Sequence, residues 1–167
     1  DVEDDTIFEN LNEINVSKCK NLRVIDIEQA GEKFTELDLS SNDKLNSLGL
    51  EGLRGLKQLK MPETDNLKEI VVKETALESL ALEKYTKLDK VCVGGNQFDI
   101  LKINMEQKTE KDIENMYLLF DNNLKVEFIS SKSGIVPNIK RLDNHNLWAG
   151  IVFSNYVVTD YEIPECW

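Results

Sequence analysis

The stretch Leu88-Asp89-Lys90-Val91-Cys92-Val93-Gly94-Gly95-Asn96-Gln97-Phe98 carries the pattern that decides the fold. An apolar residue is followed by two others, a second apolar residue, one other and a third apolar residue, and a new phrase starts at Phe98. The phrase occurs nine times at steps of ten to twelve residues: Leu11-Ile14-Val16, Leu22-Ile25-Ile27, Phe34-Leu37-Leu39, Leu45-Leu48-Leu50, Leu56-Leu59-Met61, Leu67-Ile70-Val72, Leu77-Leu80-Leu82, Leu88-Val91-Val93 and Phe98-Leu101-Ile103. Self-similarity at a nearly constant period predicts a stack of repeats.

Each phrase predicts a short strand, because its last two apolar residues lie two positions apart and therefore point to one face. Such strands can bury that face only when successive coils stack about 4.8 Å apart. Alternate phrases differ slightly in step, so one coil is expected to contain two phrases. We therefore expect residues 11–103 to form a right-handed solenoid of about four to five coils. The side chains expected inside it are Leu37, Leu48, Leu59, Ile70, Leu80 and Val91.

The residues after the third apolar position resemble a leucine-rich repeat. In that family an Asn or Cys at this slot bonds to the backbone of the neighbouring turn. Asn42, Asn96 and Cys19 occupy the slot here. The chain resembles the irregular repeats of about 21 residues found in bacterial surface and secreted proteins, Bacteroidetes especially, over about 93 of its 167 residues. Other residues at the slot predict an incomplete ladder of side chains: Ala30, Leu53, Thr64, Thr75 and Tyr85.

The rhythm stops after Ile103, which suggests two parts of one structural unit. Residues 1–103 would be the solenoid, with 1–10 as its lead-in, and 104–167 an α+β C-terminal cap. In the cap, Thr109 and Asp112 predict a helix start. Ile113, Met116, Tyr117 and Phe120 would lie on one face of that helix, Val126 and Phe128 in a strand, and 147–158 in one or two more.

The aromatic residues of this second part have two interpretations. They could cover the open end of the stack, since terminal repeats must hide unpaired strand edges. Alternatively they could present rings to a sugar or a peptide. The residues concerned are Trp148, Tyr156, Tyr161 and Trp167.

The overall charge argues against nucleic acid as a partner. The chain has 31 acidic and 20 basic residues and a net charge of −11, which repels phosphate backbones and anionic membrane surfaces. No segment resembles a membrane span or an apolar leader. We expect a monomer.

The sequence contains no recognisable catalytic, metal or cofactor motif, so we expect no enzyme activity and no cofactor. Its one histidine, His145, stands between two asparagines and has no nucleophile motif nearby. Gly94-Gly95 belongs to a repeat turn and not to a phosphate loop. Of the three cysteines, Cys19 is expected in the interior slot, whereas Cys92 should face outward. Cys92 is the candidate for chemical reactivity, although a plain surface thiol is the preferred interpretation.

The outward residues of successive strands should form aligned rows, which repeat proteins use as binding surfaces. The candidate ligand-binding residues are Arg23, Asp26, Glu28, Asn46, Glu51, Lys68, Val71, Lys73, Asp89 and Cys92. The resemblance places this strand set on the concave face. The second set, with Asn15, Asp38, Lys60, Ala81 and Lys102, is the alternative.

These observations favour a non-enzymatic binding module that recognises a protein or a glycan through its repeat surface. The resemblance implies a secreted or cell-surface protein with a role such as adhesion. Two alternatives are a structural spacer of a surface protein and the recognition domain of a larger enzyme or effector.

Overall fold

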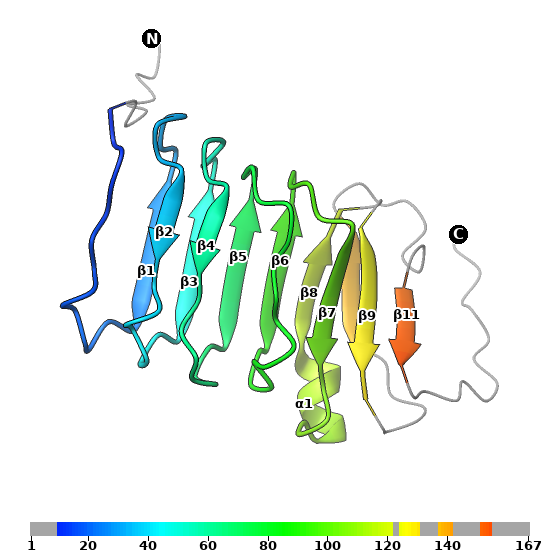
Figure 1. Cartoon of the computed structure of the whole chain (residues 1–167). Coiled ribbons are helices and arrows are strands. Elements are labelled where there is room, and N and C mark those ends of the chain that lie inside the picture. The colour runs from blue at the N-terminus through cyan, green and yellow to red at the C-terminus, as the bar shows by residue number, and fades with distance from the viewer. Residues whose placement is uncertain (1–9, 122–123, 131–136, 142–150, 155–167) are drawn as a thin grey trace, which may run out of the picture.

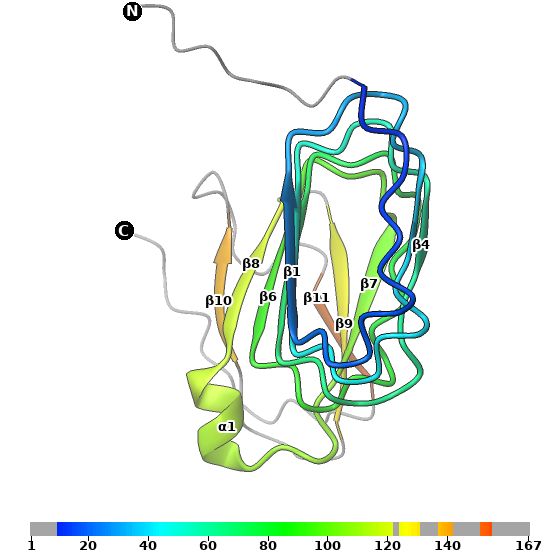
Figure 2. The ribbon, with the colours of Figure 1, turned by 90° about the vertical axis from the view of Figure 1, so that its left-hand side faces the viewer.

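The computed structural model describes residues 10–121, 124–130, 137–141 and 151–154 of the chain. These residues form a parallel β-solenoid of about five turns with very little helix (Figure 1). Figure 2 views the stack from its N-terminal end. There the chain ascends on the side of β1 (Val24–Glu28), crosses over and descends on the opposite side, where β2 (Glu36–Asp38) and, one coil later, β4 (Gln58–Lys60) lie. The coil is therefore right-handed, as expected for parallel strands joined by crossovers.

One side of the solenoid is a six-stranded sheet, called here the first sheet. Its order is β1-β3-β5-β6-β8-β10, and all neighbours are parallel. The remaining strands are β3 (Ser47–Glu51), β5 (Glu69–Lys73), β6 (Lys90–Gly94), β8 (Tyr117–Phe120) and β10 (Asn138–Arg141).

The opposite side is divided into two smaller sheets, called here the second side. One pairs β2 (Glu36–Asp38) with β4, and the other has the order β11-β9-β7. These three strands are β7 (Ile100–Asn104), β9 (Lys125–Ile129) and β11 (Ile151–Ser154). Residues 79–82, which belong to the phrase between these two groups, form no strand. The first sheet is therefore the longer uninterrupted surface.

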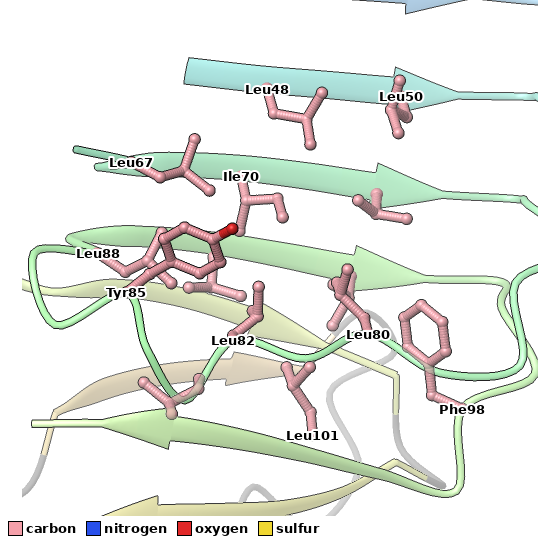
Figure 3. Close-up of a cluster of buried hydrophobic side chains, with 14 of the residues drawn as sticks. Leu48, Leu50, Leu67, Ile70, Leu80, Leu82, Tyr85, Leu88, Phe98 and Leu101 are labelled. Carbon is pink, nitrogen blue, oxygen red and sulfur yellow. The ribbon is translucent and has the colours of Figure 1, made fainter. Parts of the chain in front are cut away.

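The core lies between the two sides and consists of rows of apolar side chains (Figure 3). One row runs through Leu48, Ile70, Val91 and Leu118, which are paired across neighbouring strands and at most 1 % exposed. Of the six side chains expected inside, five are buried and Leu59 is partly buried against the same cluster. Burial of each such side chain contributes about 1.5 to 3 kcal/mol, which explains why the stack and not the single strand is stable.

The asparagine slots bond to neighbouring coils as the pattern predicts. Asn42 Nδ2 donates to the carbonyl oxygens of Val16 (3.0 Å) and Cys19 (3.1 Å). Asn96 Nδ2 donates to Val72 O at 2.8 Å, and its Oδ1 accepts hydrogen bonds from the Thr75 N–H and hydroxyl. These bonds satisfy backbone or side-chain groups that the irregular turns leave over.

Two other residues at this slot behave differently from one another. Tyr85 is fully buried and donates its hydroxyl proton to Pro62 O at 2.6 Å, so a larger side chain takes over the bonding role. Cys19 is exposed, and the expectation that it fills an interior slot is wrong. The Cys19 backbone carbonyl, not its thiol, takes part in the ladder by accepting from Asn42.

The stack continues beyond the last apolar phrase. β8 pairs with β6 in register, and β9 pairs with β7, so residues after Ile103 extend both sides of the same coil. The intervening helix α1 (Glu110–Asn115) begins at the Thr109 capping box, as expected. It ends earlier than expected, because Tyr117 and Phe120 belong to β8 and not to the helix. Lys108, just before the capping box, is buried and forms an ion pair of 2.8 Å with Asp89, which directly precedes β6.

Candidate functional site

The outer surface of the first sheet carries three aligned rows of side chains. The central row is Asp26, Gly49, Val71, Cys92 and Leu119, which follow one another across β1, β3, β5, β6 and β8. One flanking row is Glu28, Glu51, Lys73 and Gly94. The other is Val24, Ser47, Glu69, Lys90 and Tyr117. Parallel pairing keeps these rows in register, about one strand spacing apart.

Six of the ten predicted residues lie on these rows: Asp26, Glu28, Glu51, Val71, Lys73 and Cys92. The other four, Arg23, Asn46, Lys68 and Asp89, precede the strands and stack on one another through backbone hydrogen bonds. Two of these four have structural partners. Asn46 donates to Asn66 O at 3.1 Å, and Asp89 pairs with Lys108. Their side chains therefore hold the turns together and are not simply available to a ligand.

Six residues of the face do not follow from the sequence interpretation. Val24, Ser47, Glu69 and Lys90 lie two residues before the row centre, where pleating places them on the same face, whereas the interpretation used the position three residues before it. Tyr117 and Leu119 were assigned to a helix. The pattern that indicates this strand is Leu118-Leu119-Phe120, which repeats the last three positions of the apolar phrase. Leu118 and Phe120 pair with Val91 and Val93, the last two apolar residues of an earlier phrase.

A shallow hollow of about 440 Å³ opens on this face over β5, β6 and β8. Its lining residues are Val71, Lys73, Lys90, Cys92, Tyr117 and Leu119. The floor is the apolar part of the central row, and the two lysines belong to opposite flanking rows. Apolar surface next to a few polar groups is the usual composition of a binding site.

Cys92 faces outward as expected but is only 5 % exposed, because it lies in the floor of this hollow. Burial raises the pKa of its thiol, and the positive charges of Lys90 and Lys73 act against that rise. The hypothesis of a reactive surface thiol is therefore wrong for Cys92, since nucleophilic cysteines are accessible and have lowered pKa values. Both lysines line the same hollow as the thiol.

The other end of the face is acidic. Asp26 and Glu28 are exposed on β1, and Glu51 follows on β3. The Asp26 carboxylate extends over Gly49, where a Cβ would collide with Asp26 Oδ1. Glu51 Oε2 lies 3.5 Å from Lys73 Nζ, at the boundary between the acidic and the basic half. The first sheet therefore presents carboxylates at one end and lysines around an apolar floor at the other.

The second side neutralises more of its charge internally. Lys60 pairs with Glu36 (2.7 Å) and Asp38 (3.3 Å) on neighbouring β2. Hydrogen bonds from Ser40 and then Lys60 lower the pKa of Asp38, and bonds to Glu36 and Asp38 raise the pKa of Lys60. A hollow of about 700 Å³ next to β4 is mainly lined by polar side chains. It lacks the continuous apolar floor that distinguishes the first sheet.

Two features are absent from the described residues. Among them, no three His, Cys, Asp or Glu side chains gather in a way that could hold a metal ion. No helix in the described part has the length and hydropathy needed to cross a bilayer. His145 and the aromatic residues Trp148, Tyr156, Tyr161 and Trp167 lie outside the described residues.

No protein-family model, characterised protein or solved structure matches the chain. The resemblance to leucine-rich repeats therefore depends on the repeat phrase and the asparagine slots alone.

Proposed function

We propose that this chain is a non-enzymatic recognition module that binds a protein or glycan ligand through the outer face of the first sheet. The observation that carries the proposal is the hollow over β5, β6 and β8, where apolar, cationic and aromatic side chains converge on in-register strands. A long, regular surface of this kind is what solenoid proteins use for binding.

The repeat phrase and the bonding of Asn42 and Asn96 support a relation to leucine-rich repeats. By that resemblance we also propose a secreted or cell-surface location and a role in adhesion. The strands after Ile103 support the view that residues 104–167 belong to the same structural unit and help to close the stack.

The direct test is to screen the purified full chain against protein and glycan arrays. A ligand found in this way should respond to charge reversal on the first sheet. For a charged ligand, Asp26→Lys with Glu51→Lys should change the association rate about tenfold or more at low salt, because surface charge steers encounter.

The matched control is Glu78→Lys with Asp99→Lys, the same change at two exposed positions outside the first sheet. At the same low salt concentration it should change the association rate much less than the first-sheet double variant, because the two variants alter the net charge equally and differ only in position. For a charged ligand, equal responses of the two double variants would contradict the proposal, and so would chemical turnover of any ligand.

A further inference from the structure

We infer that the hollow over β5, β6 and β8 takes an extended acidic segment of a partner protein, with an apolar side chain between two carboxylates. The residue pattern would be acid, any residue, apolar, any residue, acid. This inference rests on the proposed binding role of the first sheet and specifies the chemistry of the ligand.

The spacing of the two lysines supports this pattern. Lys90 lies two residues before Cys92 in β6, and Lys73 lies two residues after Val71 in β5. Their backbone positions are therefore four residues apart along the strand direction, or about 13 Å at 3.3 Å per residue. The apolar floor of Val71, Cys92 and Leu119 occupies the space between them.

An extended peptide has the same rise and the same alternation of side chains. If its central apolar residue faces the floor, the residues two before and two after it point to the same side. Those two positions are also about 13 Å apart, which matches the separation of Lys73 and Lys90. On the face of a sheet these side-chain contacts alone must hold the peptide, because main-chain pairing requires a free strand edge.

The charges near the hollow favour carboxylates over neutral sugars. Lys90 has no ion pair within the described part of the chain, although Glu69 is its neighbour in register. Lys73 has a single long contact to Glu51, and both side chains are partly exposed, at 30 % and 46 %. A ligand carboxylate can replace such a contact at small cost, because exposed ion pairs contribute little to stability. A neutral sugar would offer no opposite charge to Lys90 and would leave Lys73 with only its long contact to Glu51.

Two isomeric peptides provide the test. The first is acetylated and amidated Glu-Ser-Phe-Ser-Glu, and the second is Ser-Glu-Phe-Glu-Ser with the same termini. Both have the same composition and charge, but in the second the carboxylates point away from the side of the phenylalanine when the peptide is extended. Each is titrated into the full-length chain labelled with nitrogen-15, and amide shifts are followed by NMR.

The first peptide should shift amides of β5, β6 and β8 and bind at least about fivefold more tightly than its isomer. Lys90→Gln should weaken its binding by about fivefold or more, and Lys90→Arg should retain it. Glu51→Gln should strengthen it, because the substitution frees Lys73. Lys57→Gln, at an exposed lysine next to β4, is the matched control and should have no effect. Thermal melts of all variants identify any change caused by misfolding.

Equal binding of the two isomers, shifts located elsewhere, or no binding of either peptide overturns this inference. Occupation of the hollow by an acidic glycan from the array, without competition by the first peptide, overturns it as well. If an array ligand still responds to the first-sheet variants in these cases, the proposed function stands. If no array ligand responds to them, the proposed function fails whatever the peptides do.

Discussion

Replacing the buried tyrosine by phenylalanine tests the irregular ladder that joins neighbouring coils. Tyr85 is fully buried, and its hydroxyl donates to Pro62 O at 2.6 Å. Tyr85→Phe keeps the ring in the core and removes only this bond. The lost hydrogen bond and the unsatisfied buried carbonyl should cost about 1 to 3 kcal/mol. For a chain of 167 residues, this corresponds to a fall in Tm of about 2 to 10 °C.

The pH dependence of the same comparison isolates the phenol group. Burial raises the pKa of Tyr85 well above its ordinary value of about 10, and the carboxylates of Glu63 and Asp65 act in the same direction. The stabilisation by the Tyr85 hydroxyl is fully present below about pH 10, which is the pKa of a tyrosine in the unfolded chain. It decreases as the pH rises from there toward the higher pKa of Tyr85 in the folded chain. The difference in unfolding free energy between wild type and Tyr85→Phe should therefore shrink by about 1.4 kcal/mol per pH unit above pH 10.

The assay is urea denaturation followed by circular dichroism between pH 8 and pH 11. The matched control is Thr35→Val, which removes a hydroxyl at an exposed position and should change stability by less than about 0.5 kcal/mol. The reasoning is refuted if Tyr85→Phe is as stable as wild type at pH 8, or if the difference between the two is constant up to pH 11.

Three further predictions concern the core, a turn and the thiols. Ile70→Ala should destabilise the fold by about 2 to 5 kcal/mol in denaturant melts, because its fully buried side chain lies between neighbouring strands. Gly52→Ala should cost about 1 kcal/mol, since Gly52 has a φ of 69° while a Cβ there meets no atom closer than 3.5 Å. In a Cys166→Ser background at pH 8, a thiol reagent should modify exposed Cys19 much faster than buried Cys92, as read by mass spectrometry of peptides.

Each of these predictions has a contradicting result. A neutral Ile70→Ala would mean that the stacked rows do not stabilise the chain. An unchanged or higher stability of Gly52→Ala would contradict the left-handed turn after β3. Equal modification rates of Cys19 and Cys92 in the folded chain would contradict the burial of Cys92 in the floor of the hollow.

The solenoid could be predicted from the sequence because its signal is repeated. Nine copies of one phrase define the inward positions, and the observed register pairs the expected residues, such as Leu48 with Ile70 and Ile70 with Val91. The central row of Asp26, Gly49, Val71 and Cys92 follows from the same period. Where many coils agree, local irregularity in one of them does not obscure the pattern.

The sequence predicts the structure less well where a pattern occurs only once along the chain. The segment around α1 separates Val91 from its partner Leu118 by 27 residues, which breaks the period of the apolar phrases. The sequence pattern therefore predicts a helix where the stack continues with β8. The burial of Cys92 also depends on neighbours from several strands, and Lys73, Lys90 and Leu119 line the same hollow. Cys19 was misplaced because only its backbone carbonyl bonds to the next coil. Such effects depend on three-dimensional neighbours that one position in a sequence does not reveal.

The most direct test of the central claim is the affinity of an array-selected ligand for two variants with the same substitution on opposite sides of the solenoid. Val71→Arg places a long cation in the floor of the hollow, and Ala81→Arg places one at an exposed position of the second side. Thermal melts first establish that both variants are folded. Binding through the first sheet then predicts at least a tenfold loss of affinity for Val71→Arg and less than a twofold change for Ala81→Arg. Unchanged affinity for Val71→Arg, or a larger loss for Ala81→Arg, would contradict it.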